Sequence, residues 1–424
     1  MATDVLIIGG GGREHALAWK LAQSPRIGKL YIAPGNGGTR LAGENIPIDA
    51  MDFENLAKFA KEKNVALTVV GPDNPLSEGI VDFFKLRRLR VWGPVKAAAH
   101  IEGSKAFAKR LMREAGVPTA AFEIFTQHDD ALAYVRERGV PIVVKANGLS
   151  FGKGVYVCMT LAEAEAALVE IMVERVFKDA GNEVVVEEYL DGQEISIHAL
   201  ADGKNFVLFP PAQDHKQIGE NDTGKNTGGM GTIAPVPFVT PEALKDIETR
   251  VVRPTLRALA EHGASYTGIL YPGLEMTSKG PKVLEFNARF GDPETQVYMR
   301  LLKTDLLDIL EASTDGKLAG TNIEWKTGFA VNIVLASGGY PDTYKKGFPI
   351  TGIEEAEKVE GVVVFHSGTS NQGESLITAG GRVLGVSAVG DTLQSALARA
   401  YEAVELIHFK GKYFRRDIGA KALV

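Results

Sequence analysis

The sequence predicts an α/β protein of several domains, on three observations. The first hundred residues alternate short apolar runs with amphipathic stretches, which is typical of a parallel sheet covered by helices. A later region, at about 120–190, joins two apolar runs through a glycine-rich turn and then becomes helical, which favours a small α+β lobe. With 424 residues the chain exceeds one ordinary core, so we expect two to four domains.

In the N-terminal region each expected element follows from an apolar run or from helical spacing. We expect strands at 4–8, 29–33, 66–70 and 89–92, and helices at 13–23 and 53–63. Ligands bind at the carboxyl ends of the strands in such sheets. The expected working edge is therefore the set of loops that follow these strands, at 9–12, 34–38, 71–75 and 93–94.

The remaining elements follow from the same signals. Ser104 has the position of an N-cap before a helix that runs to about residue 115. We expect further helices at 129–138, 161–173, 241–262, 292–302 and 392–407. We expect further strands at 141–145, 155–158, 183–190, 194–201, 205–209, 270–277, 282–286, 330–335, 362–367, 375–378 and 383–388, the last four in a unit that begins near residue 327.

Composition excludes several classes of protein. The net charge of −6 argues against a nucleic-acid-binding surface. The single cysteine, Cys158, allows neither an intramolecular disulfide nor a cysteine-based zinc site, and we expect it in a core. No run approaches the roughly 18 apolar residues of a membrane span, and the start MATDVLIIGG lacks a signal-peptide pattern. We therefore expect a cytoplasmic protein whose partners are small molecules, without nucleic acid or membrane.

The strand end in KVLEFNARFGDPETQ, residues 282–296, is the most informative stretch. Side chains two positions apart share one face of a strand, so Glu285 and Asn287 lie side by side. A carboxylate and an amide oxygen form the hard, oxygen-only site that Mg²⁺ prefers beside phosphates. Arg289 follows and can stabilise negative charge on a phosphoryl group. The alternative is an ordinary strand end with solvated polar residues.

The first glycine run, IIGGGGREHA, follows a strand and opens a helix, which suits a phosphate or a ribose at a helix N-terminus. It does not match the dinucleotide fingerprint G-x-G-x-x-G, because Glu14 or His15 occupies the sixth position. The second strand also lacks an acid for the ribose of NAD. A small phosphosugar is therefore favoured over NAD, and a tight strand–helix turn is the alternative.

The second glycine run, KANGLSFGKGV at 145–155, resembles a phosphate-binding P-loop only superficially. Asn147 replaces its first glycine and Gly154 replaces its Ser or Thr, and the run joins two strands. What remains is a glycine flap with Lys153 and, on the preceding strand, Lys145. Two lysines beside a flap suit triphosphate binding and exclusion of water. Solvated lysines on a hairpin are the alternative.

Three other stretches carry weaker signals. In VVVEEYLDGQE, backbone groups of residues 188–190 could pair with an adenine edge, and Glu194 could bind ribose hydroxyls. The polar loop at 213–231 is long enough to be functional or disordered. Asp214, His215 and Lys216 stand at its head, and His215 is expected to shape the loop. YFRRDIG at 413–419 offers two arginines for a phosphate or for solvent.

Taken in order, these pieces resemble the glycinamide ribonucleotide synthetases, or phosphoribosylamine–glycine ligases, of the ATP-grasp superfamily. The resemblance covers essentially the whole chain and is most specific in RFGDPETQ and in QDHK followed by DTGKNTGGMG. The quoted motifs also include GGREHALAWK, APGN, VVGPDNPL, EGSKAF and GLSFGKGV. The resemblance implies a Rossmann-like preATP-grasp domain at 1–101, an ATP-grasp core at 102–326 with a mobile lobe at about 120–190, and a small C-terminal domain at 327–424.

The resemblance implies that the chain joins glycine to 5-phosphoribosylamine with ATP and Mg²⁺ or Mn²⁺, an early step of purine synthesis. We expect a monomer, although no motif in the sequence reports the oligomeric state. The implied metal ligands are Glu285 and Asn287, and the implied catalytic residues are Arg289, Asp214 and Lys216. The implied nucleotide contacts are Lys105, Lys145, Gly152, Lys153 and Gly154 for phosphates, Glu187, Glu188 and Leu190 for adenine, and Glu194 for ribose. The implied contacts to the other substrates are Gly11, Gly12, Glu14, Asn36, Asp292 and Arg416.

Two features depart from the family pattern. The flap usually reads D-G-L-A-A-G-K-G, whereas this chain has Asn147 in place of the aspartate and Phe151 at the tip. Glu275 is the sole acid on the strand before Glu285, and it does not match a known ligand position. Three other functions are weighed: a different ATP-grasp ligase for a phosphosugar amine, a nucleotide-binding regulatory protein without catalysis, and an NAD-dependent dehydrogenase.

Overall fold

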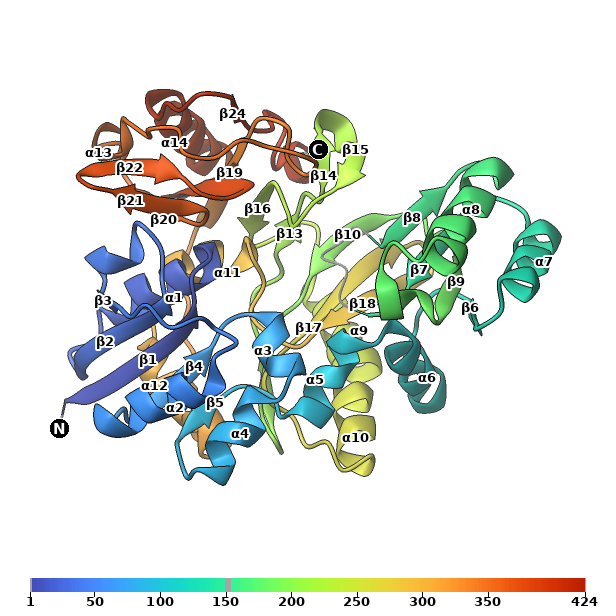
Figure 1. The fold of residues 1–424 in the computed structure, drawn as a ribbon, viewed down its shortest axis with the longest axis horizontal. Helices are drawn as coiled ribbons and strands as arrows, with labels where there is room; N and C mark the ends of the chain where they lie inside the picture. Colours follow the sequence, from blue (N-terminus) through green and yellow to red (C-terminus); the bar gives the residue numbers. More distant parts are fainter. Residues whose placement is uncertain (1, 149–153, 424) are drawn as a thin grey trace.

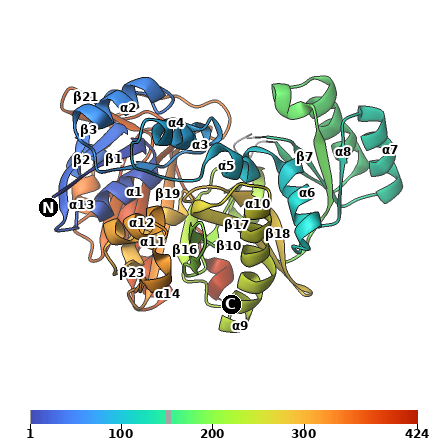
Figure 2. The same ribbon diagram turned by 90° about the horizontal axis from the view of Figure 1, so that it is seen from below.

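The structure is a computed structural model that describes residues 2–148 and 154–423. It confirms an α/β protein with separate sheets (Figure 1). The N-terminal and C-terminal sheets lie at one end of the long axis, and a lobe containing α7 (His128–Arg138) and α8 (Leu161–Leu168) lies at the other end (Figures 1 and 2). None of the helices in the described ranges combines the length and apolar character needed to cross a membrane.

The N-terminal sheet is parallel and has the strand order β3-β2-β1-β4-β5. Alternate residues of β1 pack into two different cores, because helices cover both faces of the sheet. The order reverses at β1, so the loops after β1 and β4 form the crevice where such sheets bind ligands. The elements are β1 (Thr3–Gly9), α1 (Gly12–Leu21), β2 (Ile27–Pro34), β3 (Glu44–Asn45), α2 (Phe53–Glu62), β4 (Leu67–Val70), α3 (Asp73–Ser77), α4 (Ile80–Leu86), β5 (Val91–Trp92) and α5 (Lys96–Gly103).

The helix α6 (Lys105–Ala115) connects this sheet to the lobe. Ser104 caps it as predicted, since its hydroxyl accepts a hydrogen bond from the Phe107 N–H at 3.1 Å. At the other end Gly116 adopts a left-handed conformation (φ 66°), which stops the helix. The cap fixes the direction in which Lys105 leaves the first turn.

The lobe is a four-stranded antiparallel sheet in the order β6-β9-β7-β8 with helices on one side. Its strands are β6 (Phe122–Phe125), β7 (Ile142–Ala146), β8 (Val155–Cys158) and β9 (Val184–Glu188). The helix α8 continues through a π-helical turn at Val169–Val173, and a 3-10 turn follows at Lys178–Gly181. The lobe has its own apolar core, and Cys158 is buried in it as predicted.

The central sheet is built around the long strand β17 (Thr267–Thr277), which pairs with β18 (Gly280–Asn287) and with two strands on its other side. Those two are β10 (Gln193–Ser196) and β11 (Ala199–Asp202), so the single strand expected at 194–201 is broken. At the break, the His198 ring accepts a hydrogen bond from the Gly291 N–H at 3.0 Å. The sheet also contains β12 (Phe206–Leu208), and its helices are α9 (Pro241–Ile247), a π-helical turn (Glu248–Val252), α10 (Arg253–Glu261), α11 (Glu294–Leu301) and α12 (Leu306–Thr314).

The C-terminal sheet takes two strands from the middle of the chain. Its order is β13-β16-β19-β23-β20, with β24 beside β19. The strands β13 (Gln213–Asp214) and β16 (Gly231–Ala234) flank the polar loop, whose hairpin is β14 (Gln217–Gly219) and β15 (Thr223–Asn226). The other elements are β19 (Phe329–Ser337), α13 (Ile353–Ala356), β20 (Val362–His366), β21 (Thr369–Gln372), β22 (Ser375–Thr378), β23 (Arg382–Gly390), α14 (Leu393–Leu406) and β24 (Lys412–Tyr413). The polar loop is thereby anchored to residues that follow it by a hundred positions.

Candidate active site

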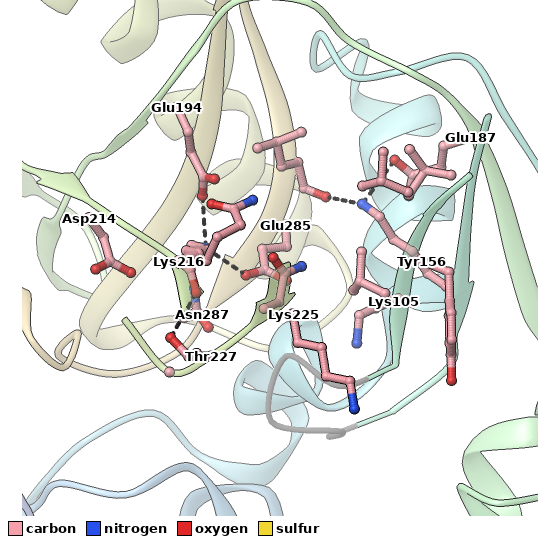
Figure 3. Close-up of a pocket in the computed structure, with 18 of the residues that line it drawn as sticks. Lys105, Tyr156, Glu187, Glu194, Asp214, Lys216, Lys225, Thr227, Glu285 and Asn287 are labelled. Atoms are coloured by element: carbon pink, nitrogen blue, oxygen red, sulfur yellow. Dashed lines mark hydrogen bonds and ion pairs between the residues drawn. The ribbon is translucent and has the colours of Figure 1, made fainter. Parts of the chain in front are cut away.

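A cleft of about 1500 Å³ lies where the lobe, the central sheet and the C-terminal sheet meet. Side chains from all three converge on it (Figure 3). Its polar lining includes Lys105, Lys145, Glu187, Glu188, Glu194, Asp214, Lys216, Glu285, Asn287, Arg289 and Asp292, all of which the sequence analysis selected. Residues from widely separated motifs thus share one cavity.

The strand end of β18 projects into the middle of this cleft. Glu285 lies 3.3 Å from the ammonium nitrogen of Lys216, which also lies 2.8 Å from Glu194. Burial alone would raise the pKa of Glu285, but Lys216, Lys105 and Lys145 outweigh it and lower that pKa to about 2. Glu285 is therefore an ionised carboxylate throughout the physiological range.

Asn287 and Arg289 follow on the same edge. The Asn287 amide oxygen accepts a hydrogen bond from Arg289 at 3.3 Å. The Arg289 guanidinium lies 2.9 Å from Glu102 and 3.7 Å from Asp73, two acids of the N-terminal region. Burial would lower the pKa of Arg289, but Glu102 and Asp73 raise it above its usual value. These two acids were not among the predicted site residues, although VVGPDNPL and EGSKAF contain them.

Glu285 and Asn287 fit a hard divalent cation, because their oxygens share one strand edge and the carboxylate is ionised. In the described part of the chain, no group of three or more His, Cys, Asp or Glu side chains is arranged to hold a metal. Two protein ligands suit Mg²⁺, which usually takes one or two protein carboxylates and completes its shell with phosphates and water. Glu275 lies opposite Glu194 on the neighbouring strand. Burial and the charge of Glu194 raise the pKa of Glu275 to about 7, so it is a poorer cation ligand.

The lysines lie on the lobe side of the cleft. Lys105 donates to the Gly148 carbonyl at 2.8 Å, at the beginning of the glycine flap. Lys145 donates to Glu187 at 3.0 Å and to the Leu284 carbonyl at 3.1 Å. The two ends of the flap are joined by a hydrogen bond, which the Gly154 carbonyl accepts from the Ala146 N–H at 2.8 Å. The predicted contacts Gly152 and Lys153 lie outside the described residues.

The end of β9 and the segment after it form an apolar groove beside the lysines. Leu190 lines this groove together with Val143, Val155, Leu284 and Phe286. The Glu188 side chain accepts hydrogen bonds from the Ala121 N–H at 3.0 Å and from Lys282 at 2.7 Å. The Glu187 side chain is committed to lysines, so backbone groups are the ones available to the edge of a base here.

Two acids lie at the far end of the cleft. Burial and the nearby charge of Glu294 raise the pKa of Asp214 well above its usual range. Glu294 itself accepts hydrogen bonds from Tyr271 at 2.5 Å and from Ser196 at 2.8 Å. Gly229 passes over Asp214 with φ 109°, and a Cβ there would lie 2.5 Å from the carboxylate, so only glycine fits. Glu294 was not among the predicted site residues, although it belongs to RFGDPETQ.

The head of the polar loop is fixed by His215. Its ring contacts the Gly231 carbonyl at 3.0 Å and accepts from the Gly419 N–H at 3.0 Å. Burial lowers the pKa of His215 to about 4, so it is neutral at pH 7. These contacts agree with the expectation that His215 shapes the loop.

Asp292 lines the cleft and lies beside the N-terminal glycine run. It lies 3.3 Å from Arg382 of β23, which also donates to the Gly228 and Asp292 carbonyls at 2.6 Å. The resemblance named no role for Arg382, because a lone arginine on a C-terminal strand carries no local signal. In the structure it joins the polar loop to the RFGDP turn.

In the first glycine run, Arg13 lines the cleft, whereas the predicted contacts Gly11, Gly12 and Glu14 lie behind it. A Cβ on Gly11 would lie 3.4 Å from Asp292. Glu14 accepts the Gly11 N–H at 2.6 Å, and Gly12 packs against Ser367 and Gln296. The Asn36 amide nitrogen donates to the Gly10 carbonyl at 2.9 Å and its oxygen accepts from the Gly38 N–H at 2.8 Å. Asn36 therefore holds together the loop that follows β1 and the loop that follows β2.

The structure does not bring Arg416 to the cleft. Its exposed side chain pairs with Glu405 at 2.9 Å on α14. The neighbouring Arg415 is fully buried and pairs with Asp417 at 2.7 Å and Asp222 at 3.0 Å. Two adjacent arginines thus have different environments, and the one nearer to the polar loop is Arg415.

Comparisons with known proteins agree with this architecture. Residues 3–102, 103–295 and 330–421 match, in that order, the N domain, the ATP-grasp (A) domain and the C domain of the phosphoribosylglycinamide synthetase family. The phosphoribosylamine–glycine ligase of Pasteurella multocida is 50% identical over 99% of this chain and 98% of its own, and that of Chlorobaculum tepidum is 49% identical over 99% and 100%.

Solved structures share this fold. The crystal structure of phosphoribosylamine–glycine ligase from Thermotoga maritima has a TM-score of 0.85 and 35% identity, and covers 98% of this chain and 100% of that one. The biotin carboxylase domain of the Hydrogenobacter thermophilus 2-oxoglutarate carboxylase shares the fold, with a TM-score of 0.72 at 18% identity over 98% and 92% of the two chains. The chain belongs to the phosphoribosylglycinamide synthetase family and has its ATP-grasp fold.

Proposed function

We propose that this protein joins glycine to 5-phosphoribosylamine and converts ATP to ADP and phosphate, giving glycinamide ribonucleotide for purine biosynthesis in the cytoplasm. Membership of the family supports the reaction. The observation that carries the assignment to this cleft is the meeting of Glu285, Asn287 and Arg289 with Lys105 and Lys145 in one cavity. These are the oxygen ligands and cations that phosphoryl transfer requires.

The first proposed step activates glycine. A carboxylate oxygen of glycine bonds to the γ-phosphorus of ATP, and the bond from that phosphorus to ADP breaks, giving glycyl phosphate. Lys105, Lys145 and Arg289 spread the charge that moves during this transfer. Mg²⁺ or Mn²⁺ bound to Glu285 and Asn287 would neutralise phosphate charge beside these residues.

The second proposed step forms the product. The amine nitrogen of phosphoribosylamine attacks the carbonyl carbon of glycyl phosphate, phosphate leaves, and the nitrogen loses a proton. No covalent bond to the protein is needed. Lys216 pairs with Glu285, and the charge of Asp214 acts on Lys216, so these two residues are proposed to position glycine. Asp292 lies beside Gly11 of the glycine run. Acyl phosphates react with water, so exclusion of water from the cleft would protect the intermediate.

The nucleotide is proposed to lie along the lobe side of the cleft. The apolar groove beside Leu190 suits an adenine ring, with backbone groups of residues 187–190 at its edge. Glu194 lines the same cleft and pairs with Lys216, which also pairs with Glu285, and its carboxylate is proposed to bind the ribose hydroxyls. The phosphates would then point toward Lys105 and Lys145.

ADP release measured with ATP, Mg²⁺ and glycine tests the proposal, with phosphoribosylamine formed in place from ribose 5-phosphate and ammonia. We expect release that requires both glycine and the phosphosugar amine, with glycinamide ribonucleotide identified as the product. Release with a different acid or amine would assign another ligase reaction to the cleft. ATP binding without substrate-dependent release would contradict the proposed catalysis.

A further inference from the structure

Lys109 is a buried lysine in the cleft that the proposed reaction does not use. It lies one turn after Lys105 on α6, and only 2% of its surface is exposed. Its ammonium nitrogen lies 3.0 Å from Glu187 and 2.6 Å from the Thr119 hydroxyl oxygen. Burying an ammonium group is unfavourable unless it is paired, so its place at the wall of a ligand cleft needs an explanation.

Lys109 shares its carboxylate with a second lysine. The ammonium nitrogens of Lys109 and Lys145 each lie 3.0 Å from the same Glu187 oxygen, Oε2. The other oxygen, Oε1, is buried and accepts no hydrogen bond. One lysine would suffice to neutralise Glu187, so this cluster carries an excess positive charge, and all three residues line the cleft. An excess cation at a cleft wall is a feature of sites that bind anions.

We infer that Lys109 is the permanent counter-ion of Glu187, which lets Lys145 turn from Glu187 to the nucleotide phosphates when ATP binds. This makes Lys109 a positioning residue, and the inference rests on the proposed function only in that the cleft binds ATP. With Lys109 in place, Glu187 stays paired after Lys145 turns away. Without Lys109, the same movement would leave a buried carboxylate without a partner, which is strongly unfavourable.

The geometry of the two lysines supports this division of roles. Lys109 is held by Glu187 and by Thr119, whose hydroxyl donates in turn to the Val283 carbonyl at 2.6 Å. Lys145 has Glu187 and one backbone carbonyl as partners. Lys109 is thus fixed by a hydrogen-bonded chain to the central sheet, whereas Lys145 lies on β7 at the base of the glycine flap.

The protonation of Lys109 gives a second readout. Burial lowers its pKa to about 8, although Glu187 opposes this shift. The other charged groups that act on it are Lys145, which lowers the pKa further, and Glu188, which raises it. Above about pH 8 Lys109 loses its charge, so we expect ATP binding by the unaltered protein to weaken there.

Titration calorimetry of the full chain with ATP and Mg²⁺ tests the inference. We expect Lys109→Met to weaken ATP binding by about 10- to 100-fold at pH 7, in proportion to the penalty of an unpaired buried charge. The double variant Lys109→Met, Glu187→Gln should bind within about threefold of Glu187→Gln alone, because a neutral amide side chain at position 187 needs no counter-ion. Lys109→Arg should retain binding at pH 7 and keep it to higher pH than the unaltered protein.

Arg110→Met is the matched control, since Arg110 is the next residue on α6 and pairs with Glu183 at the surface at 2.7 Å. It should bind ATP normally. The inference is overturned if Lys109→Met binds as tightly as the unaltered protein, or if it is weakened equally with and without Glu187→Gln. If Lys109→Met does not fold, the double variant and Lys109→Arg still decide the matter. Normal ATP binding without glycine-dependent ADP release would contradict the proposed function and leave this inference standing.

Discussion

Lys216 and Glu285 form an ion pair at 3.3 Å across the cleft, although 69 positions separate them in the chain. The same ammonium group also pairs with Glu194 at 2.8 Å. Lys216 therefore holds the proposed metal-binding carboxylate in place and links it to the proposed ribose acid. Because Lys216 keeps one partner when the other is removed, Glu285 can be altered without leaving Lys216 unpaired.

The first prediction concerns Glu285. We expect Glu285→Ala to lower turnover at least about 10³-fold, because the site loses its charged metal ligand. The melting temperature should change by only a few degrees, since Lys216 remains paired with Glu194. Steady-state ADP release and thermal unfolding measure the two effects. Glu355→Ala, at an exposed pair with Lys358, is the control, and full turnover of Glu285→Ala with Mg²⁺ would refute the metal assignment.

The second prediction concerns Arg289. The conservative change Arg289→Lys retains a positive charge beside Glu102 and Asp73 but loses the planar fork that contacts both acids and is proposed to contact substrate. We expect kcat to fall about 10²-fold while the Kd for ATP changes little. Single-turnover kinetics and calorimetry separate the two quantities. Unchanged kcat would mean that Arg289 serves only to join the N-terminal region to the core.

The third prediction follows from Glu275, which faces Glu194 across the sheet. Its pKa rises from 4.5 to about 7 on folding, because of burial and the charge of Glu194. Between pH 4.5 and about pH 7, Glu275 keeps its proton in the folded protein but loses it in the unfolded chain, so the free energy of unfolding falls as pH rises. Glu275→Gln should increase the free energy of unfolding at pH 8 by ~1 kcal/mol after solvent screening, and by nothing at pH 4. Urea unfolding at both pH values checks this, and an equal effect at both would contradict the assignment.

The fourth prediction explains the departure at the flap. The Asn147 amide donates to Glu183 at 2.8 Å and its oxygen accepts from Ser104 at 3.0 Å. An aspartate at this position would place a second carboxylate against Glu183. We expect Asn147→Asp to destabilise the protein by roughly 1–3 kcal/mol, and Asn147→Asp with Glu183→Gln to recover most of the loss. Chemical unfolding measures both, and an equal loss in the double variant would show that Glu183 is not the cause.

The fifth prediction separates the two adjacent arginines. Arg415→Met should cost about 3 kcal/mol, because it leaves Asp417 and Asp222 without their buried partner and frees the polar loop. Arg416→Ala should change the free energy of unfolding by less than about 0.5 kcal/mol, since its pair with Glu405 is exposed. We also expect unchanged KM values for Arg416→Ala. A raised KM for phosphoribosylamine would restore Arg416 as a substrate contact.

The sequence by itself determined the local structure. The apolar run of β1, the Ser104 cap and the alternation that puts Glu285 beside Asn287 depend on a few neighbouring residues, so their periods and caps could be recognised. The helical segments at 129–138 and 392–407 agree with α7 and α14 within one residue at each end. Short motifs in a characteristic order also sufficed to identify the family.

Only the tertiary structure decided which distant groups meet. Arg289 finds Glu102 and Asp73, Lys109 and Lys145 share Glu187, and Arg382 reaches Asp292 from the C-terminal sheet. The insertion of β13 and β16 into that sheet and the burial of Arg415 rather than Arg416 likewise left no local pattern. Pairing across a long chain is set by how whole sheets pack and by the need to give each buried charge a partner, and neither has a period that a sequence displays.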